Sequence, residues 1–480
     1  MEKSTVNLFE KFIEIEDKYN FFEIKINNIK IWQYIRFSCC AKILEELTGV
    51  RTTNKENRKK IICQSKKDIN EYFKRNEFLL RKKTLLIINH PRRVKDGKIY
   101  KCFVTDAFLK SIKSSYYVFE DSYEGKHYQP VPTKNIKYRN INNLQNWISY
   151  NDKNDREKIK TVVKKIIKCF EKELLIQFGV KLNKYIFELI DNTLRMIFYG
   201  RLYAKIILRL IRPKAVLIAV HYNVYNQALI EVAKEMKIPT IELQHGRIGE
   251  SHAAYNFINI RNIETFPDYV FVYGNYEKEI PRYPITKEQI FAIGYPELEQ
   301  KAEYYKKIKK ENKRKVVTFI SSPTDGNIIS KYAIEFAKRT KEKDFKIIYK
   351  LHPSEYNTWK EQYLNLTEYK ISIVNSNLHD IYYYLGHSDY VIGISSTVLF
   401  EAMMFNVNII ILREQDYIKC KAIYENNCAT LVSSAEELIN VIGKNNMNTF
   451  SHNVDFYFER NSIKKMKDAI NTILDKTIIK

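Results

Sequence analysis

Short apolar runs alternate with stretches long enough for a helix along most of this chain. In the first half these runs occupy residues 84–88, 115–119, 215–220, 238–244 and 268–274, and in the second half residues 316–321, 346–349, 371–374, 390–394, 408–412 and 429–432. A strand buried on both faces of a parallel sheet reads as a continuous apolar run. Strands that alternate with helices over short links form parallel, doubly wound sheets. The sequence therefore predicts an α/β protein.

The alternation pauses near residues 275–315 and then restarts, which predicts two Rossmann-like domains, and a length of 480 residues agrees with this. The expected division is an N-terminal helical extension (1–83), an N-terminal domain (84–280) with a helical insertion (151–212), a C-terminal domain (281–455) and a C-terminal helix (456–480). Apolar residues repeat at spacings of three and four over 159–170, as on the buried face of a helix. We expect Gly179 to divide the insertion into two helices.

The amino-acid composition limits the partners and the kinds of site that we expect. Hydrophobic residues make up 45% of the chain, enough for packed cores, and the net charge of +24 favours anionic partners such as nucleotide phosphates, acidic glycans or a lipid surface. No recognised nucleic-acid-binding module is present, so we expect no nucleic-acid partner. The seven cysteines are scattered without a C-x-x-C pair, which argues against a disulfide framework and against a zinc site.

The N-terminal residues do not form a signal peptide, and no apolar run reaches the roughly 20 residues of a spanning helix. We therefore expect a cytoplasmic protein. Near the N-terminus, Trp32, Ile35 and Arg36 share one helical face. We expect Trp32 to pack in the core and Arg36 to be a surface charge.

Polar residues follow several of the predicted strands, and the first such group is Gln244-His245-Gly246. Ligands of doubly wound sheets bind outside the carboxyl ends of the strands, so a polar group at a strand end is placed for chemistry. Gly246 is expected to let the chain turn sharply, because glycine has no Cβ. The alternative is a loop histidine that hydrogen-bonds nearby backbone.

A second group is Lys350-Leu351-His352-Pro353, which follows the run at 346–349. Pro353 disfavours the helical region for the residue before it, so we expect His352 to have an extended backbone.

A third group, Ser395, Ser396 and Thr397, follows the run at 390–394 and precedes an expected helix. A helix N-terminus attracts anions, phosphate above all. Glu401 lies one turn further on, where it is placed to accept hydrogen bonds from ribose hydroxyls. An ordinary helix cap is the alternative for the hydroxyls.

An acidic pair, Glu120 and Asp121, ends the run at 115–119. Two adjacent carboxylates at a strand end can act as a general base if their environment raises a pKa. They can equally cap the turn that follows.

These motifs resemble those of bacterial surface-polysaccharide transferases. Gln244-His245-Gly246 resembles the His-Gly strand end of the CDP-glycerol:poly(glycerophosphate) glycerophosphotransferase family, and His352-Pro353 with Ser395-Ser396 also resembles elements of sialyltransferases that use CMP-sialic acid. Glu120-Asp121 is similar to the acidic pair of those sialyltransferases and to an acidic motif of capsular Kdo transferases, although Ser122 stands where they have a glycine.

The resemblance implies a GT-B fold, in which two Rossmann-like domains face a cleft, an N-terminal one for the acceptor and a C-terminal one for the nucleotide. The implied catalytic residues are His245, Asp121 and Glu120. The residues implied to bind the nucleotide donor are Lys350, His352, Pro353, Ser395, Ser396, Thr397, Glu401, Gly246 and Gln244.

The implied activity is transfer of a sugar or polyol phosphate from a CMP- or CDP-linked donor to a growing surface glycan. The donor would be a substrate, and no cofactor is expected. No Asp-x-Asp pair stands at a strand end, so we expect no essential metal. The implied partners are the donor and a glycan or lipid-linked acceptor. The net charge of +24, the lack of a spanning segment and the basic faces of residues 155–212 add an anionic membrane surface at the inner membrane face. Two alternatives are a UDP-sugar 2-epimerase and a non-catalytic glycan-binding protein on the same scaffold.

Overall fold

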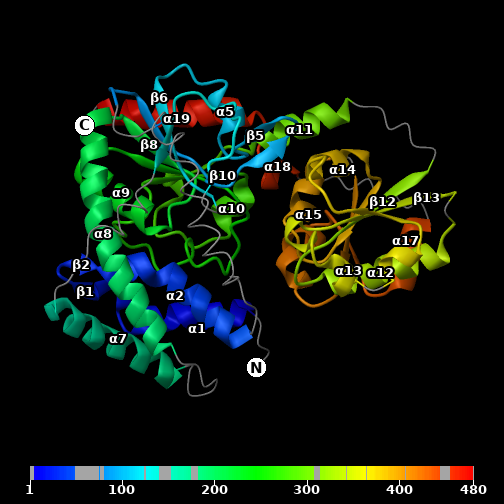
Figure 1. The fold of residues 1–480 in the computed structure, drawn as a ribbon, viewed down its shortest axis with the longest axis horizontal. Helices are drawn as coiled ribbons and strands as arrows, with labels where there is room; N and C mark the ends of the chain where they lie inside the picture. Colours follow the sequence, from blue (N-terminus) through cyan, green and yellow to red (C-terminus); the bar gives the residue numbers. More distant parts are fainter. Residues whose placement is uncertain are drawn as a thin grey trace. The chain divides into compact units, whose positions relative to one another are not determined.

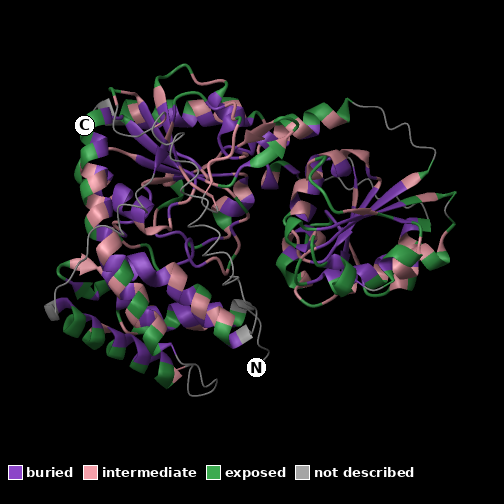
Figure 2. Cartoon of the chain, in the orientation of Figure 1, coloured by how far each residue is buried: buried purple, intermediate pink, exposed green. Residues whose placement is uncertain are grey.

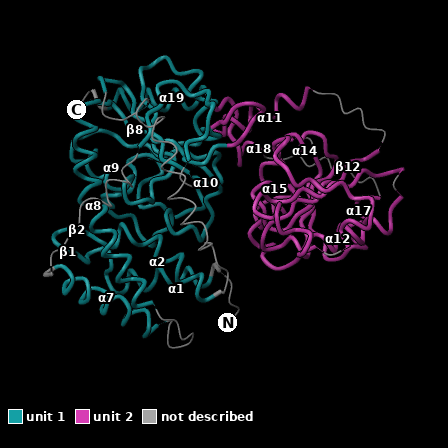
Figure 3. Tube along the Cα trace, viewed as in Figure 1, with its two compact units in different colours: residues 1–93, 102–293, 463–480 teal, residues 94–101, 294–462 magenta. Residues whose placement is uncertain are grey.

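The structure is a computed structural model, and it describes residues 5–48, 75, 80–123, 126–139, 153–173, 182–307, 314–341, 343–363, 365–405, 407–443 and 454–478. Gly179, the predicted helix break, lies outside these residues. Two compact units make up the chain (Figure 3). The first unit comprises residues 1–93, 102–293 and 463–480, and the second comprises residues 94–101 and 294–462.

The first unit is built on a parallel sheet with the strand order β11-β10-β9-β8-β3-β6-β7 (Figure 1). Its strands are β3 (Leu85–Ile88), β6 (Tyr116–Asp121), β7 (Ile136–Arg139), β8 (Ala215–Ile218), β9 (Thr240–Leu243), β10 (Tyr269–Val272) and β11 (Ile290–Ala292). The predicted runs did not include β7, because a lysine and an arginine interrupt its apolar residues.

Helices and two short strands complete the first unit. They are α1 (Thr5–Lys18), η1 (Phe21–Glu23), β1 (Lys25–Ile26), β2 (Ile29–Lys30), α2 (Ile31–Thr48), α5 (Asp106–Leu109), α7 (Lys153–Glu173), α8 (Asn183–Ile211), α9 (Val224–Glu235), α10 (Asn275–Glu279), η4 (Lys287–Gln289) and α19 (Ser462–Ile478).

Both faces of the first sheet are covered by apolar cores. Leu86 and Ile218 pack on one face with residues of α8 and α9. Leu85 and Leu217, which alternate with them along β3 and β8, pack on the other face with residues of α5 and α19. Strand side chains point alternately to the two faces of a sheet, so an all-apolar strand serves both cores.

Helices α1, α2 and α7 pack with the first part of α8 around a cluster of aromatic rings. Trp32 lies in this cluster, as predicted, 4.7 Å from the Phe21 ring centroid, and its Nε1 donates to Glu16. The prediction that Arg36 is a surface charge is wrong, because only 4% of this residue is exposed. Its guanidinium pairs with Glu16 at 2.6 Å and donates to the carbonyl oxygen of Asn256 at 2.7 Å. Neutralisation by Glu16 offsets the cost of burying this cation.

The second unit is built on a parallel sheet with the strand order β14-β13-β12-β15-β16-β17. Its strands are β12 (Lys315–Ile320), β13 (Phe345–Lys350), β14 (Ile371–Val374), β15 (Tyr390–Gly393), β16 (Asn408–Leu412) and β17 (Thr430–Val432). The chain builds outwards from β12 to β14, then returns to the other side of β12 for β15 to β17. This is the order of a dinucleotide-binding sheet, and its switch point lies between β12 and β15.

The second unit also contains a hairpin and several helices. They are β4 (Val94–Asp96), β5 (Ile99–Lys101), α11 (Pro296–Lys306), α12 (Gly326–Arg339), η5 (Pro353–Glu355), α13 (Trp359–Gln362), η6 (Leu366–Glu368), α14 (Ile381–His387), α15 (Val398–Glu401), η7 (Ala402–Met404), η8 (Tyr417–Cys420), α16 (Lys421–Glu425), α17 (Ala435–Gly443) and α18 (Val454–Tyr457).

The predicted fold class, α/β with two doubly wound parallel sheets and helical additions at the N-terminus, is confirmed. The chain passes from the first unit to the second after Ile293 and returns at Ile463. Within the predicted helix 456–480, the structure has the end of α18 and then α19. Met466, Ile470 and Ile473 of α19 belong to the core of the first unit.

Candidate functional site

The carboxyl ends of five adjacent strands bring polar side chains to one edge of the first sheet. In the order β9, β8, β3, β6, β7, these ends carry His245, His221 with Tyr222, His90, Glu120 with Asp121, and Arg139. Parallel strands all end on the same side, so residues separated by over a hundred positions share this edge.

The acidic pair on β6 is held by two arginines. Glu120 is buried and accepts hydrogen bonds from Arg93 Nε at 3.0 Å and from Asn89 at 2.7 Å. Burial raises the pKa of Glu120, while the cation of Arg93 opposes that shift. Asp121 accepts two hydrogen bonds from Arg139, from Nε at 2.7 Å and from a terminal nitrogen at 2.5 Å. Both carboxylates thus have the partners of structural ion pairs rather than the exposure of a free base.

His245 has a different environment. Its Nε2 lies 2.9 Å from the hydroxyl of Tyr222, and its ring centroid lies 5.6 Å from that of His90. Its Nδ1 is buried and has no hydrogen-bond partner within the described residues. Burial lowers the pKa of His245 to about 4, although the charge of Glu242 acts in the opposite direction. The imidazole is therefore neutral near pH 7, and burial disfavours the imidazolium that it would become on accepting a proton.

Gln244 and Gly246 shape the end of β9. The Gln244 side chain donates to the carbonyl oxygen of Gly246 at 2.9 Å and accepts from the backbone N–H of Tyr273 at 2.6 Å, so it ties β9 to the end of β10. Gly246 does not have a positive φ, and open space surrounds the position a Cβ would occupy. The turn after His245 therefore does not require glycine, contrary to the sequence-based interpretation.

A buried carboxylate on β9, that of Glu242, contacts side chains next to this edge. Glu242 accepts a hydrogen bond from the Tyr255 hydroxyl at 2.8 Å, and it lies 2.5 Å from Nδ1 of His221. The His221 ring in turn packs edge-on against Tyr222, with ring centroids 5.3 Å apart. These contacts fix the aromatic ring whose hydroxyl meets His245.

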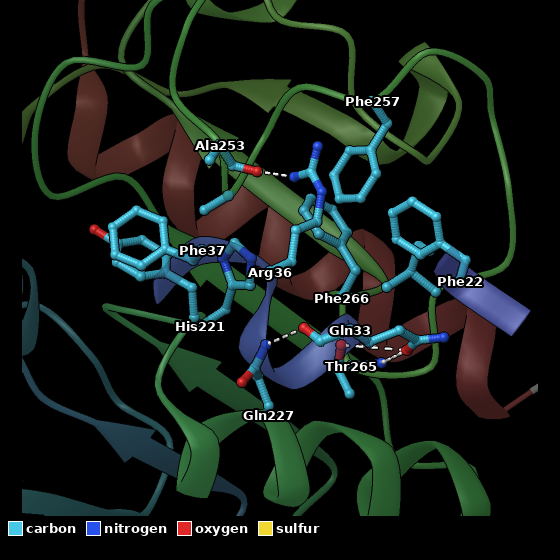
Figure 4. Close-up of a pocket in the computed structure, with 13 residues that line it drawn as sticks. Phe22, Gln33, Arg36, Phe37, His221, Gln227, Ala253, Phe257, Thr265 and Phe266 are labelled. Carbon is cyan, nitrogen blue, oxygen red and sulfur yellow. Dashed lines mark hydrogen bonds between the residues drawn. The ribbon is translucent and has the colours of Figure 1, made fainter. Parts of the chain in front are cut away.

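Tyr222 also lines a pocket within the first unit, between α2 and the loops after β8 and β9 (Figure 4). Gln227 lines this pocket, and its side-chain nitrogen donates to the backbone oxygen of Gln33 at 2.9 Å. Its Oε1 is buried without a partner among the described residues. The guanidinium carbon of Arg36 lies 4.3 Å from the ring centroid of Phe257. Sequence reasoning missed this pocket, because its wall combines a helix near the N-terminus with loops about two hundred residues later.

The corresponding edge of the second sheet carries loops after β12, β13 and β15. Ser395, after β15, donates its hydroxyl to Asp325 at 2.6 Å, and Ser322, after β12, donates to the same oxygen at 3.0 Å. The switch point of the sheet is thus bridged by two serines and one carboxylate.

Ser396 and Thr397 contribute little to this bridge. The Ser396 hydroxyl accepts a long hydrogen bond, 3.3 Å, from the backbone N–H of Val398, and Thr397 is exposed. The helix that follows, α15, has only four residues. The predicted anion site at a helix N-terminus therefore depends on the hydroxyl groups themselves, because a four-residue helix has little dipole.

The loop after β13 is arranged around Lys350 and His352. Lys350 Nζ donates to the Tyr356 hydroxyl at 2.7 Å and to the carbonyl oxygen of Leu351 at 3.0 Å, and burial lowers its pKa to about 8. His352 has the predicted extended backbone, with φ −68° and ψ 145°, and Pro353 begins the turn η5. Nδ1 of His352 lies 2.7 Å from the Ser354 hydroxyl.

Glu355 links this loop to the one after β12. It accepts from the backbone N–H of His352 at 2.6 Å and from the Ser321 hydroxyl at 2.9 Å. Glu401 lies in α15, and burial raises its pKa to about 7 while the Tyr382 hydroxyl opposes the shift.

The loop after β12 was not predicted as part of the site. Ser321, Ser322 and Asp325 belong to the segment Ser-Ser-Pro-Thr-Asp-Gly that follows the apolar run. Small polar residues and a glycine directly after a predicted strand were a usable signal. Gly326 is needed here, because a Cβ would lie 2.0 Å from the Tyr363 hydroxyl and 2.6 Å from that of Ser321.

The predicted site residues fall into two sets. In the second unit, Ser395 contacts the loop after β12 directly, and Glu355 joins that loop to His352. Gln244, Gly246 and the predicted catalytic residues belong to the first unit. Within the described residues, no group of three or more His, Cys, Asp and Glu side chains is arranged to hold a metal ion. None of the described helices combines the length and the apolarity that crossing a membrane requires.

Comparisons with protein-family models and with curated proteins found no match. Among solved structures, the chain is similar to a putative UDP-N-acetylglucosamine 2-epimerase from Listeria monocytogenes (TM-score 0.48, 12% identity, covering 82% of this chain and 97% of that one). It is similar to the UDP-GlcNAc 2-epimerase from Methanocaldococcus jannaschii (TM-score 0.47, 14% identity, 81% and 98% covered). It is also similar to the wall teichoic acid polymerase TagF (TM-score 0.46, 13% identity, 89% and 100% covered). Similarity of this size does not distinguish one reaction from another.

Proposed function

We propose that this chain is an enzyme that transfers a sugar or a polyol phosphate from a CMP- or CDP-linked donor to a growing surface glycan. The observation that carries the proposal is the switch point of the second sheet, where polar loops after β12, β13 and β15 lie together. In doubly wound sheets this is the place where nucleotides bind. A glycan or lipid-linked acceptor, a cytoplasmic location at the inner membrane face and independence from metal are parts of the same proposal.

In the second unit, Lys350 and Ser395 have the chemistry to bind the phosphate of the donor. The Lys350 ammonium offsets phosphate charge, and the serine hydroxyl donates to a phosphate oxygen. Ser395 donates to Asp325 in this structure, so it must exchange that partner for the phosphate when the nucleotide binds. A carboxylate that holds the hydroxyl in place also repels an anion, and the lysine has to outweigh this repulsion.

In the first unit, His245 is the group best suited to act as the base. With Nε2 protonated and donating to Tyr222, Nδ1 keeps a lone pair without a partner among the described residues. This buried atom has to become accessible when the acceptor binds, so that it can take the acceptor's hydroxyl proton. The acceptor oxygen forms a bond to the transferred group while the bond to the nucleotide phosphate breaks, and the leaving phosphate oxygen keeps the electron pair. Asp121 is the weaker candidate, because Arg139 occupies both of its oxygens.

Isothermal titration calorimetry with CMP, CDP, UDP and GDP tests the nucleotide site. We expect a cytidine nucleotide to bind best, and Ser395→Ala with Ser396→Ala to weaken its binding by about 1–3 kcal/mol, the usual cost of lost hydrogen bonds to a charged group. Ser372→Ala, at an exposed position of β14, is the matched control and should bind like the wild type. Equal affinity of the double variant and the wild type would contradict the assignment.

A further inference from the structure

Four large apolar side chains lie exposed in one row on α8. Phe198 is 56% exposed, Leu202 52%, Ile206 45% and Leu210 44%. They recur every four residues, the spacing that places side chains on the same face of a helix. At 1.5 Å per residue the row is about 18 Å long. Exposed stretches along α8 are visible in Figure 2. We name these four residues the α8 apolar row.

The opposite face of α8 is already occupied. Ala204, Ile207 and Leu208 pack into the core beside the first sheet. The helix is therefore fixed by the fold, and the apolar row and its neighbours are the part of it that a partner can reach. A contiguous exposed apolar surface of this kind marks an interaction site more often than single exposed residues do.

Cations accompany the α8 apolar row. Arg201, Lys205 and Arg209 each precede a row residue by one position, so they form a parallel line beside it. Arg201 pairs with Glu231 and, at 2.6 Å, with Glu235, and Lys205 lies 4.0 Å from Glu235, so these two cations are largely neutralised.

The positive charge grows towards the end of the helix. Arg209, Arg212 and Lys214 are exposed. Within the described parts of the chain, none of these three residues forms an ion pair. The surface thus combines an apolar row with a cationic end.

We propose that the α8 apolar row and the cations beside it dock the first unit on an anionic lipid surface. Helices that lie in a membrane interface bury an apolar face at the acyl boundary and hold anionic headgroups with lysine and arginine. A helix with one face anchored in a folded domain lies flat on such a surface and does not span it. This inference is independent of the proposed reaction, because it uses no residue of the nucleotide site or of the proposed base.

A second copy of the chain suits this surface less well. Two α8 helices packed face to face in antiparallel fashion would bring their cation lines to the same edge, and the whole chain carries a net charge of +24. Like charges across an interface are unfavourable, whereas anionic headgroups complement them.

Vesicle sedimentation tests the proposal with the full chain. Vesicles of phosphatidylcholine containing phosphatidylglycerol should bind the wild type, and vesicles of phosphatidylcholine alone should bind it much less. Phe198→Ser with Leu202→Ser should reduce binding to the anionic vesicles roughly ten-fold or more, because the buried apolar contacts are lost. Arg209→Gln with Arg212→Gln should weaken binding and flatten its dependence on salt.

The matched control is Ile260→Ser with Leu378→Ser, which removes apolar side chains that are 67% and 78% exposed elsewhere on the chain. It should bind like the wild type. A further variant, Leu202→Trp, should show a blue shift of its tryptophan emission when anionic vesicles are added, beyond any shift of the wild type.

Unchanged binding by the Phe198 and Leu202 double variant, or no added blue shift in the Leu202→Trp variant, would overturn the proposal. So would light scattering that finds the wild type dimeric and that double variant monomeric, since a second copy would then cover the row. Calorimetry with CDP on the same proteins reports on the nucleotide site separately. Loss of vesicle binding with intact nucleotide binding therefore cannot be mistaken for failure of the proposed reaction.

Discussion

The two sheets offer different chemistry at the same topological place. At the carboxyl edge of the first sheet, Glu120 and Asp121 are neutralised by Arg93 and Arg139, and His245 is neutral near pH 7. At the edge of the second sheet, hydroxyl groups lie in loops at the switch point, and Lys350 ends the neighbouring strand β13.

The difference follows from where the polar groups sit. Glu120 ends an inner strand, so its charge is buried and requires a full set of partners. Ser322 and Ser395 lie half-buried in loops beyond the strands, where a hydroxyl can exchange its partner when a ligand arrives. Strand ends that look equivalent in a sequence therefore differ in whether their polar groups are buried with a full set of partners, as Glu120 is, or half-buried and able to change partners, as the two serines are.

The largest expected effect concerns the base of the first edge. His245→Ala should lower turnover by about 10²–10⁴-fold, the range for loss of general base catalysis, with little change in nucleotide affinity. Asp121→Asn should have a much smaller effect on turnover, because Arg139 already holds the carboxylate. Steady-state kinetics with a CMP- or CDP-linked donor measures both. Near-normal turnover of His245→Ala together with an inactive Asp121→Asn would reverse the roles.

Removing Arg93, which pairs with buried carboxylates at the carboxyl edge of the first sheet, should destabilise the protein. Arg93→Ala leaves Glu120 and Asp106 buried without their cation, so we expect the free energy of unfolding to fall by about 3–5 kcal/mol. The matched control is Arg460→Ala, which removes an exposed ion pair with Asp455 and should cost about 0–1 kcal/mol. Urea unfolding followed by circular dichroism compares the variants. An equal decrease in the free energy of unfolding in both variants would mean that the buried Arg93 ion pairs do not stabilise this edge of the sheet.

The sequence was informative where a residue's environment is local. Buried strands such as Leu85–Ile88 were predictable, since they are apolar throughout, and so was the extended backbone of His352, since Pro353 imposes it. The roles of Glu120 and Asp121 were not predictable, because Arg93 and Arg139 reach them from other strand ends. Arg36 was assigned to the surface for the same reason, since Asn256, one of the groups that satisfy it, lies far along the chain. Asp325 was not predicted as a site residue, because its place in the site follows from a hydrogen bond with Ser395, seventy residues away.

The smallest expected effect is a dependence on pH above 7, which we expect from Lys350 in the second unit and not from His245 in the first. Burial holds the pKa of Lys350 at about 8, below its ordinary 10.5, so the folded chain releases this proton more readily than the unfolded chain does. A bound phosphate favours the charged form, and each pH unit above the pKa lowers the charged fraction about ten-fold. Affinity for CDP should therefore fall several-fold between pH 7 and about 9.5.

Stability should change in the opposite direction over this range. Between pH 8 and 10.5 the unfolded chain binds more protons at Lys350 than the folded chain does, so this residue's contribution to stability increases with pH. His245, with a pKa of about 4, is neutral throughout and adds no pH dependence there. Calorimetry at several pH values, with Lys350→Gln as the variant that should lose the slope, checks the sign. A rise in stability over this range that persists in Lys350→Gln would contradict the assignment to Lys350. Glu401, with a pKa of about 7, does not cause such a rise, because this carboxyl is almost fully ionised in the folded and the unfolded chain above pH 8.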